Sequence, residues 1–247
     1  MKHLISKITA VILFAASMQS TSAFGADGVA AWRGLVNTDW ATAANWLDGQ
    51  LPSALATGTG PTFIDPNPNN LFPVVSTLGN TTPGYFYIGT NTGFSVVSGG
   101  ELTVAGDLTT GVWGNTLPIN ITGGLLNMGG YLNMGAGGFD GSVNISGGTV
   151  TAGDFGINTT SGSKLNISGN GTFVTTNNPG LLGAINSYIN SGLITANGNA
   201  AGWSVNLDTV SQAGKVVVTA VPEPSTLASL GMGLALLAAT RSLRKKS

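Results

Sequence analysis

Apolar and polar residues alternate in short runs along the middle of the chain, and the runs recur at a nearly constant interval. Each run has the order apolar, polar, apolar, Ser or Thr, and then Gly. Five blocks follow this order, the first and last more loosely, at residues 95–104, 119–128, 143–152, 165–174 and 188–197. Their Ser or Thr positions are Ser98, Thr122, Ser146, Ser168 and Ser191, which are 24, 24, 22 and 23 residues apart. Such a repeat predicts stacked structural units.

Within each block the alternation predicts a half-buried strand. In the second block, Ile119 and Ile121 would point to one side and Asn120 to the other, because successive side chains of a strand face opposite ways. The next two blocks repeat this arrangement with Val143, Asn144 and Ile145, and with Leu165, Asn166 and Ile167. The glycine after each Ser or Thr allows a sharp turn, and a second short strand follows it.

A period of about 23 residues predicts an all-β chain that folds as a single-domain parallel β-solenoid, or β-helix, over residues 81–220. One coil cannot bury its apolar side alone, whereas stacked coils share one continuous core. Coils stacked at about 4.8 Å would bring the successive asparagines into a ladder on the outer surface. An antiparallel β-sandwich is the competing architecture, because the same residue propensities allow it.

The segment before the repeats, residues 26–80, is predicted to form an N-terminal cap. Trp32, Trp40 and Trp46 could cover the first coil and keep its edge from pairing with other chains. Exposed tryptophans could instead stack on sugar rings. The element AANW followed by LP, within residues 43–52, resembles the opening of many Gly-rich, autotransporter-like surface repeat proteins.

Residues 1–25 have the pattern of a secretory signal peptide, which we expect to be helical. Lys2 and Lys7 give a positive start, and an apolar stretch follows from Ile8 to Ala16. Small residues precede a cleavage site after Ala23. The pattern therefore predicts that the protein is exported.

Composition narrows the chemistry that the mature chain could perform. Only 8% of the residues are charged, cysteine is absent, and the single histidine is His3 within the leader. Between Ala26 and Ala220 there are three basic and nine acidic residues, so no basic surface is available for nucleic acid. Without histidine or cysteine in the body, Ser-His-Asp and Cys-His catalysis and common zinc sites are excluded. We expect no metal, no cofactor and no catalytic residues.

Two carboxylates are nevertheless considered as candidate catalytic residues, because parallel β-helices include polysaccharide lyases and glycosidases. Asp107 and Asp154 both follow Ala-Gly and would lie two coils apart, at about 9.6 Å. Inverting glycosidases use carboxyl groups about 6.5–9.5 Å apart. No further charged residue accompanies the pair, and aspartate commonly completes turns, which favours a structural role.

The C-terminal segment, residues 221–247, combines three features in order. Pro222, Glu223 and Pro224 come first, and an apolar run of 14 residues, 227–240, follows. As a helix this run would be about 21 Å long, which is short for a hydrocarbon layer of about 30 Å. The basic residues Arg241, Arg244, Lys245 and Lys246 close the chain and would stay in the cytoplasm during a transient insertion into the inner membrane.

This order closely resembles the PEP-CTERM protein-sorting signal. The resemblance implies recognition by an exosortase-type membrane transpeptidase, export across a Gram-negative envelope, and association with extracellular polysaccharide or biofilm. It implies nothing about the chemistry of residues 26–220. We therefore expect a non-enzymatic protein of the cell surface or extracellular matrix; a carbohydrate-active enzyme on the same solenoid and a self-associating adhesin are the alternatives.

Overall fold

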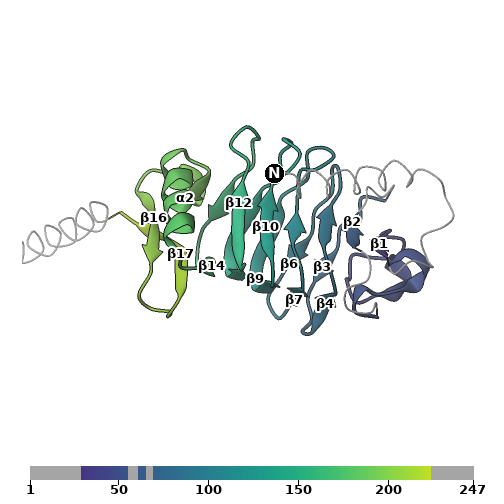
Figure 1. Cartoon of the computed structure of the whole chain (residues 1–247). Coiled ribbons are helices and arrows are strands. Elements are labelled where there is room, and N and C mark those ends of the chain that lie inside the picture. The colour runs from purple at the N-terminus through teal and green to yellow at the C-terminus, as the bar shows by residue number, and fades with distance from the viewer. Residues whose placement is uncertain (1–28, 55–60, 65–68, 224–247) are drawn as a thin grey trace, which may run out of the picture.

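The computed structural model describes residues 29–54, 61–64 and 69–223. Over these residues the chain is mostly β and forms a solenoid of about five turns, which confirms the predicted β-solenoid (Figure 1). The predicted signal peptide, Pro224 and the apolar run 227–240 lie outside the described residues.

From residue 62 onward, each turn contributes one strand to a six-stranded sheet and two strand segments to an eleven-stranded sheet. The six-stranded sheet is parallel throughout, in the order β1 (Ala30–Trp32), β2 (Thr62–Ile64), β5 (Phe86–Ile88), β8 (Leu108–Thr109), β10 (Tyr131–Met134) and β12 (Asp154–Ile157). Because β1 and β2 already belong to this stack, parallel pairing begins well before residue 81.

The eleven-stranded sheet covers two sides of the solenoid. One side contains β3 (Val74–Val75), β6 (Ser95–Val96), the first halves of β9 (Ile119–Met128) and β11 (Val143–Thr151), β13 (Leu165–Ile167) and β15 (Ile194–Ala196). The other contains β4 (Asn80–Thr82), β7 (Glu101–Val104), the second halves of β9 and β11, and β14 (Thr172–Thr176). The competing sandwich architecture is therefore wrong.

Glycines with positive φ mark the corner between these two sides. Gly124 and Gly148 have φ values of 69° and 70°, a region that side-chain-bearing residues rarely adopt. A Cβ atom at Gly148 would overlap the carbonyl oxygen of Gly124 in the neighbouring turn. At Gly124 and Gly148 the glycine is therefore required both by its own backbone and by the turn stacked against it.

The core is a column of apolar side chains repeated from turn to turn. Val96, Ile121, Ile145 and Ile167 occupy equivalent positions in consecutive turns, and each is 0% exposed. Complete burial of such a side chain stabilises the fold by about 1.5–3 kcal/mol. The apolar positions of the repeat thus point inward, as the alternation predicted.

Aromatic packing closes the N-terminal end. The rings of Trp32 and Trp40 meet that of Trp46 edge-to-face at centroid distances of 5.2 and 4.7 Å, beside three short 3-10 helices, η1 (Ala43–Asn45), η2 (Leu47–Gly49) and η3 (Pro52–Ala54). None of the three tryptophans is more than 2% exposed. The faces of these three rings are therefore covered by protein and are not available for stacking on sugars, and the capping role of residues 26–80 stays a prediction.

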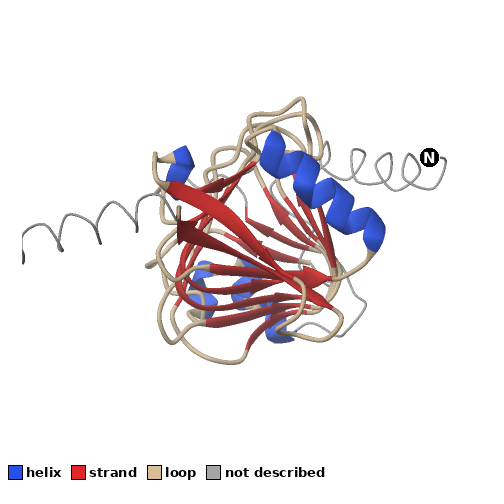
Figure 2. Ribbon diagram, turned by 90° about the vertical axis from the view of Figure 1, so that its left-hand side faces the viewer, coloured by secondary structure: helices blue, strands red, loops and turns tan. Residues whose placement is uncertain are grey.

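The C-terminal end departs from the repeat. After β14 the chain forms helix α2 (Pro179–Asn190), which packs Leu181 and Ile185 into the core and brings Tyr188 against Phe155. Asn178 caps this helix by accepting a hydrogen bond from the Leu181 N–H at 2.8 Å. Figure 2 looks at this end and shows α2 lying across the edge of the strand stack.

Two predictions for this end are wrong. Residues 188–190 of the fifth block are helical, and β15 pairs Ile194 with Leu165, so the repeat continues only after an insertion. The last two strands, β16 (Trp203–Asp208) and β17 (Lys215–Pro222), are antiparallel: β17 pairs with β14, and β16 pairs with β17. A short hairpin connection reverses the chain here, whereas a parallel strand would need a full coil.

Candidate functional site

The predicted sorting motif starts inside the folded body. Pro222 is the last residue of β17 and lies opposite Trp203, and the Glu223 N–H donates to the Gly202 carbonyl at 2.9 Å. Pro224 and the four basic residues Arg241, Arg244, Lys245 and Lys246 lie outside the described residues. The motif therefore begins within the last strand: Pro222 belongs to β17, and Glu223 is held by a backbone hydrogen bond to Gly202.

Within the described part of the chain, no helix is long and apolar enough to cross a membrane. The segment predicted for transient insertion, 227–240, lies outside the described residues.

The predicted asparagine ladder is present on the outer surface. Asn144 pairs with Asn120 on one side and Asn166 on the other, and its Nδ2 donates to Asn120 Oδ1 at 3.1 Å. Asn166 Oδ1 accepts hydrogen bonds from Thr195 Oγ1 at 2.9 Å and from the Gly198 N–H at 2.7 Å. The ladder links consecutive turns from outside the core, and it continues past the helical insertion.

The two candidate carboxylates lie where the repeat predicted, with Tyr131 between them. Tyr131 pairs with Asp154 in the next turn, and its N–H donates to Asp107 Oδ1 of the preceding turn at 2.8 Å. Asp154 Oδ1 accepts from the N–H of Phe155 at 2.7 Å. One oxygen of each carboxylate therefore accepts a hydrogen bond from a backbone N–H.

The Tyr131 phenol on this face has a strongly raised pKa. Burial, reinforced by the nearby Asp154, Tyr188 and Asp107, raises the pKa of its phenol to about 12. The phenol therefore stays protonated at neutral pH and could donate a hydrogen bond, but it could not act as a base there. Among the described residues, no three His, Cys, Asp or Glu side chains gather into a group that could hold a metal ion.

A cluster of aromatic rings on the outside of the six-stranded sheet was not anticipated. Phe63 stacks on Tyr87 at a centroid distance of 5.4 Å, and Trp113 lies 5.6 Å from Tyr87. Tyr85 extends the cluster and is 43% exposed. Phe63 and Tyr87 pair directly and are 24 residues apart, so extending the repeat count to the residues before the first block would have revealed them.

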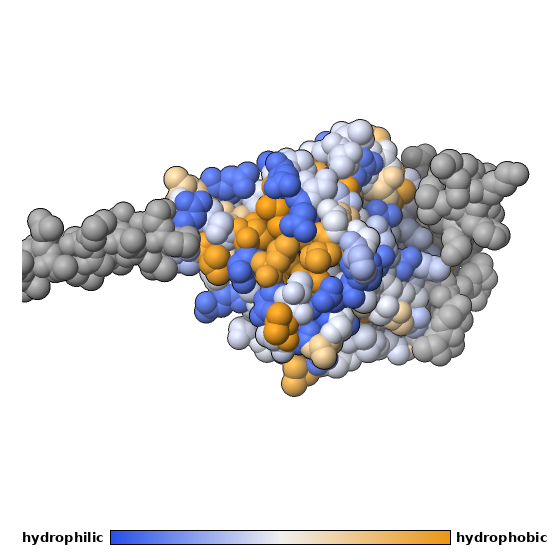
Figure 3. Space-filling model, turned by 60° about the vertical axis from the view of Figure 1, so that its left-hand side comes forward, coloured by the Kyte–Doolittle hydropathy of each residue, from blue (hydrophilic) through white to orange (hydrophobic). Residues whose placement is uncertain are grey.

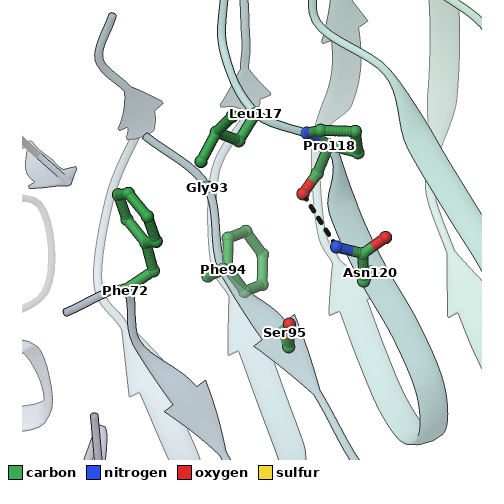
Figure 4. Close-up of a pocket in the computed structure, with 7 residues that line it drawn as sticks. All are labelled: Phe72, Gly93, Phe94, Ser95, Leu117, Pro118 and Asn120. Carbon is green, nitrogen blue, oxygen red and sulfur yellow. Dashed lines mark hydrogen bonds between the residues drawn. The ribbon is translucent and has the colours of Figure 1, made fainter. Parts of the chain in front are cut away.

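The shallow hollow in Figure 4 offers little for catalysis. Its lining residues are Phe72, Gly93, Phe94, Ser95, Leu117, Pro118 and Asn120. None of them is charged, and the Asn120 amide is already engaged, because Nδ2 donates to the Pro118 carbonyl at 3.2 Å. The hollow could accept a small apolar group but provides no acid, base or nucleophile of ordinary strength.

Comparison with known proteins identifies one feature. The PEP-CTERM protein-sorting motif matches residues 220–245. This motif indicates an exported protein that an exosortase-type system recognises and directs to the cell surface or envelope. No curated protein matches the chain. No solved structure matches it either. The comparisons give no support to the resemblance between the repeat body and autotransporter-like proteins.

Proposed function

We propose that the mature protein is a non-enzymatic structural component of the cell surface or extracellular matrix, where it associates with exopolysaccharide. The observation that carries this proposal is the continuity between β17 and the sorting motif, since Pro222 belongs to both. The sorted cargo is thus the solenoid itself, delivered as a rigid folded unit.

The outer surface supports association with a neutral or weakly charged polymer. The asparagine ladder and the exposed Tyr85 provide amide, hydroxyl and aromatic groups, which hydrogen-bond to sugar hydroxyls and pack against sugar rings. With only 8% charged residues in the chain, long-range attraction to a strongly charged polymer would be weak.

The non-enzymatic role is favoured by how the carboxylates are used. An inverting glycosidase needs one carboxylic acid and one carboxylate free to meet substrate and water. In Asp107 and in Asp154 one carboxylate oxygen accepts a hydrogen bond from a backbone N–H, which supports a structural use of these residues. A test of the alternative is incubation of the purified protein with the exopolysaccharide of the producing cell. Depolymerisation that disappears in Asp107→Asn or Asp154→Asn would overturn the proposal.

In this proposal, residues 227–240 hold the chain transiently in the inner membrane while the exosortase-type enzyme acts near Pro222–Pro224. Deleting 224–247 leaves β17 complete, so the body should fold but lose surface delivery. Glu223→Ala keeps the apolar run and the basic tail, and should also lose processing if the motif is recognised as such. Cell fractionation with mass spectrometry of the mature C-terminus measures both. Wild-type processing of Glu223→Ala would show that the apolar run acts only as an anchor.

Association with polysaccharide is tested separately by co-sedimentation of the protein with the producing cell's exopolysaccharide. Tyr85→Ala should weaken co-sedimentation, whereas Leu78→Ala is a control, since Leu78 is also exposed but lies outside the aromatic cluster. Equal binding by both variants and the wild type would remove Tyr85 from the proposed surface. Absence of any wild-type binding would refute the polysaccharide association.

A further inference from the structure

The eleven-stranded sheet ends in an open strand. β16 pairs with β17 on one side, and within the described residues no strand pairs with its other side. Open strand edges offer a row of backbone donors and acceptors to another chain, and proteins usually block them with Pro, Lys or a bulge. β16, with the sequence WSVNLD, contains no Pro or Lys, and its one charged residue, Asp208, is at the end of the strand.

The hydrogen bond from Glu223 to Gly202 shows which backbone groups of β16 face outward. In an antiparallel pair, residues that exchange hydrogen bonds alternate with residues that do not. Gly202 and Glu223 form a hydrogen-bonded pair, so Ser204, Asn206 and Asp208 also direct their N–H and C=O groups toward β17. The outward-facing groups are therefore those of Trp203, Val205 and Leu207, which we call the β16 edge.

We propose that the β16 edge binds the β16 edge of a second copy of this chain, in an antiparallel arrangement with Val205 opposite Val205 of the other copy. In this register, Trp203 lies opposite Leu207 of the other copy, and Leu207 opposite its Trp203. All three outward-facing residues then form hydrogen-bonded pairs. Shifting the register by two residues leaves one of them opposite a residue outside β16.

The side chains are complementary in the same register. Opposite residues of an antiparallel pair share a face, so the apolar row of Trp203, Val205 and Leu207 continues into the same row of the second copy. Val205 and Leu207 already pack against the core of their own chain. On the other face, Ser204 lies opposite Asn206 of the second copy, and two uncharged polar side chains can meet there without repulsion.

The apolar surface around β16, at the C-terminal end of the solenoid, is also compatible with a second copy as the partner. Figure 3 shows an apolar area at the end that carries α2 and the β16–β17 hairpin. Apolar side chains that are only partly buried against the core at this end are Leu182, Ile189, Leu193, Val205 and Leu207. A second copy joined at β16 would continue the eleven-stranded sheet across the two-fold axis and cover part of this area. The pairing requires only the body and is independent of the proposed sorting and polysaccharide association.

Cysteine cross-linking tests the register directly, because the chain has no cysteine of its own. Residues opposite each other in a non-hydrogen-bonded pair have Cα atoms about 4.5 Å apart, which lies within the disulfide range of about 4.4–6.8 Å. A mixture of the exported Ser204→Cys and Asn206→Cys proteins should therefore form a disulfide-linked dimer. Each variant alone should not, nor should a mixture of Ser204→Cys and Asp208→Cys. No dimer in the first mixture, or equal linkage of Asn206→Cys alone, would overturn the proposal.

A charge series on the polar face gives a second test that leaves the core untouched. In S204K/N206K, each new lysine lies opposite a lysine of the second copy, so sedimentation velocity should show loss of the dimer. In S204K/N206D, each lysine lies opposite an aspartate, and the dimer should return. Unchanged thermal unfolding of the dilute proteins would establish that both variants fold. A wild-type protein that sediments as a monomer at every concentration, or two variants that behave alike, would overturn the proposal.

Discussion

The stacked glycines at the corner of the solenoid make a quantitative prediction about stability. Gly148 has a φ of 70°, and a Cβ atom there would overlap the carbonyl oxygen of Gly124 in the adjacent turn. Gly198 has a similar φ of 65°, but a Cβ atom there would have no heavy atom within 4 Å. Comparing Gly148→Ala with Gly198→Ala therefore separates the overlap between turns from the cost of the backbone conformation.

The conformational cost of alanine at positive φ, about 1–2 kcal/mol, applies to both variants and cancels in the comparison. Forcing an extra methyl group into a packed site costs a further 1–3 kcal/mol, roughly, and applies to Gly148→Ala alone. For a body of this size, 1 kcal/mol lowers Tm by about 2–4 °C. Gly148→Ala should therefore unfold about 2–12 °C below Gly198→Ala in a circular dichroism melt. Equal Tm values would refute the claim that the turns contact each other through this glycine.

Three further predictions concern the ends, the ladder and the outer face. Trp46→Ala should cost about 3–5 kcal/mol of unfolding free energy in urea titration, because it opens a cavity beneath Trp32 and Trp40, and a loss below 1 kcal/mol would contradict the capping role. Asn144→Ala should cost about 0.5–1.5 kcal/mol in the same assay by removing the bond to Asn120, whereas the exposed Asn186→Ala should cost less than half of that. Because the pKa of Tyr131 is raised to about 12, folding favours its neutral form, and stability should fall as pH rises from about 10 toward 12. Tyr131→Phe should reduce that alkaline loss, and an identical pH profile for both proteins would contradict the assignment.

The repeat between residues 119 and 174 was predictable because two signals agree there. Inward apolar residues such as Ile121 and Ile145, and outward asparagines such as Asn120 and Asn144, recur in the same phase. Stacked turns require both rows to be in register, so a sequence that satisfies both rows has little freedom to fold otherwise. The register of Asp107, Tyr131 and Asp154 followed from the same period.

The C-terminal end was not predictable from alternation alone. Tyr188, Ile189 and Asn190 match the apolar and polar order of the repeat, but the helix that contains them begins ten residues earlier at an Asn-Pro pair. The capped helix start determines the local structure more strongly than three alternating residues do. The reason is that the side chains of Leu181 and Ile185 are buried together only in the helix. Likewise, the repeat could show that Asp107 and Asp154 align, but not that one oxygen of each accepts a hydrogen bond from a backbone N–H.

The two ends of the solenoid solve the problem of exposed strand edges differently. An exported chain without cysteine depends on packing and backbone hydrogen bonds for stability, and a stack of parallel strands leaves such bonds unmade at each end. At the N-terminal end, the Trp32–Trp40–Trp46 cluster is buried over the first turns. At the C-terminal end, α2 and the antiparallel β17 end the parallel stack, but β16 then becomes a new edge directly beside the first residues of the sorting motif. β16 lacks the proline, lysine or bulge that usually blocks an edge. In our proposal its partner is the identical edge of another copy, which would form hydrogen bonds with the backbone groups of Trp203, Val205 and Leu207 together.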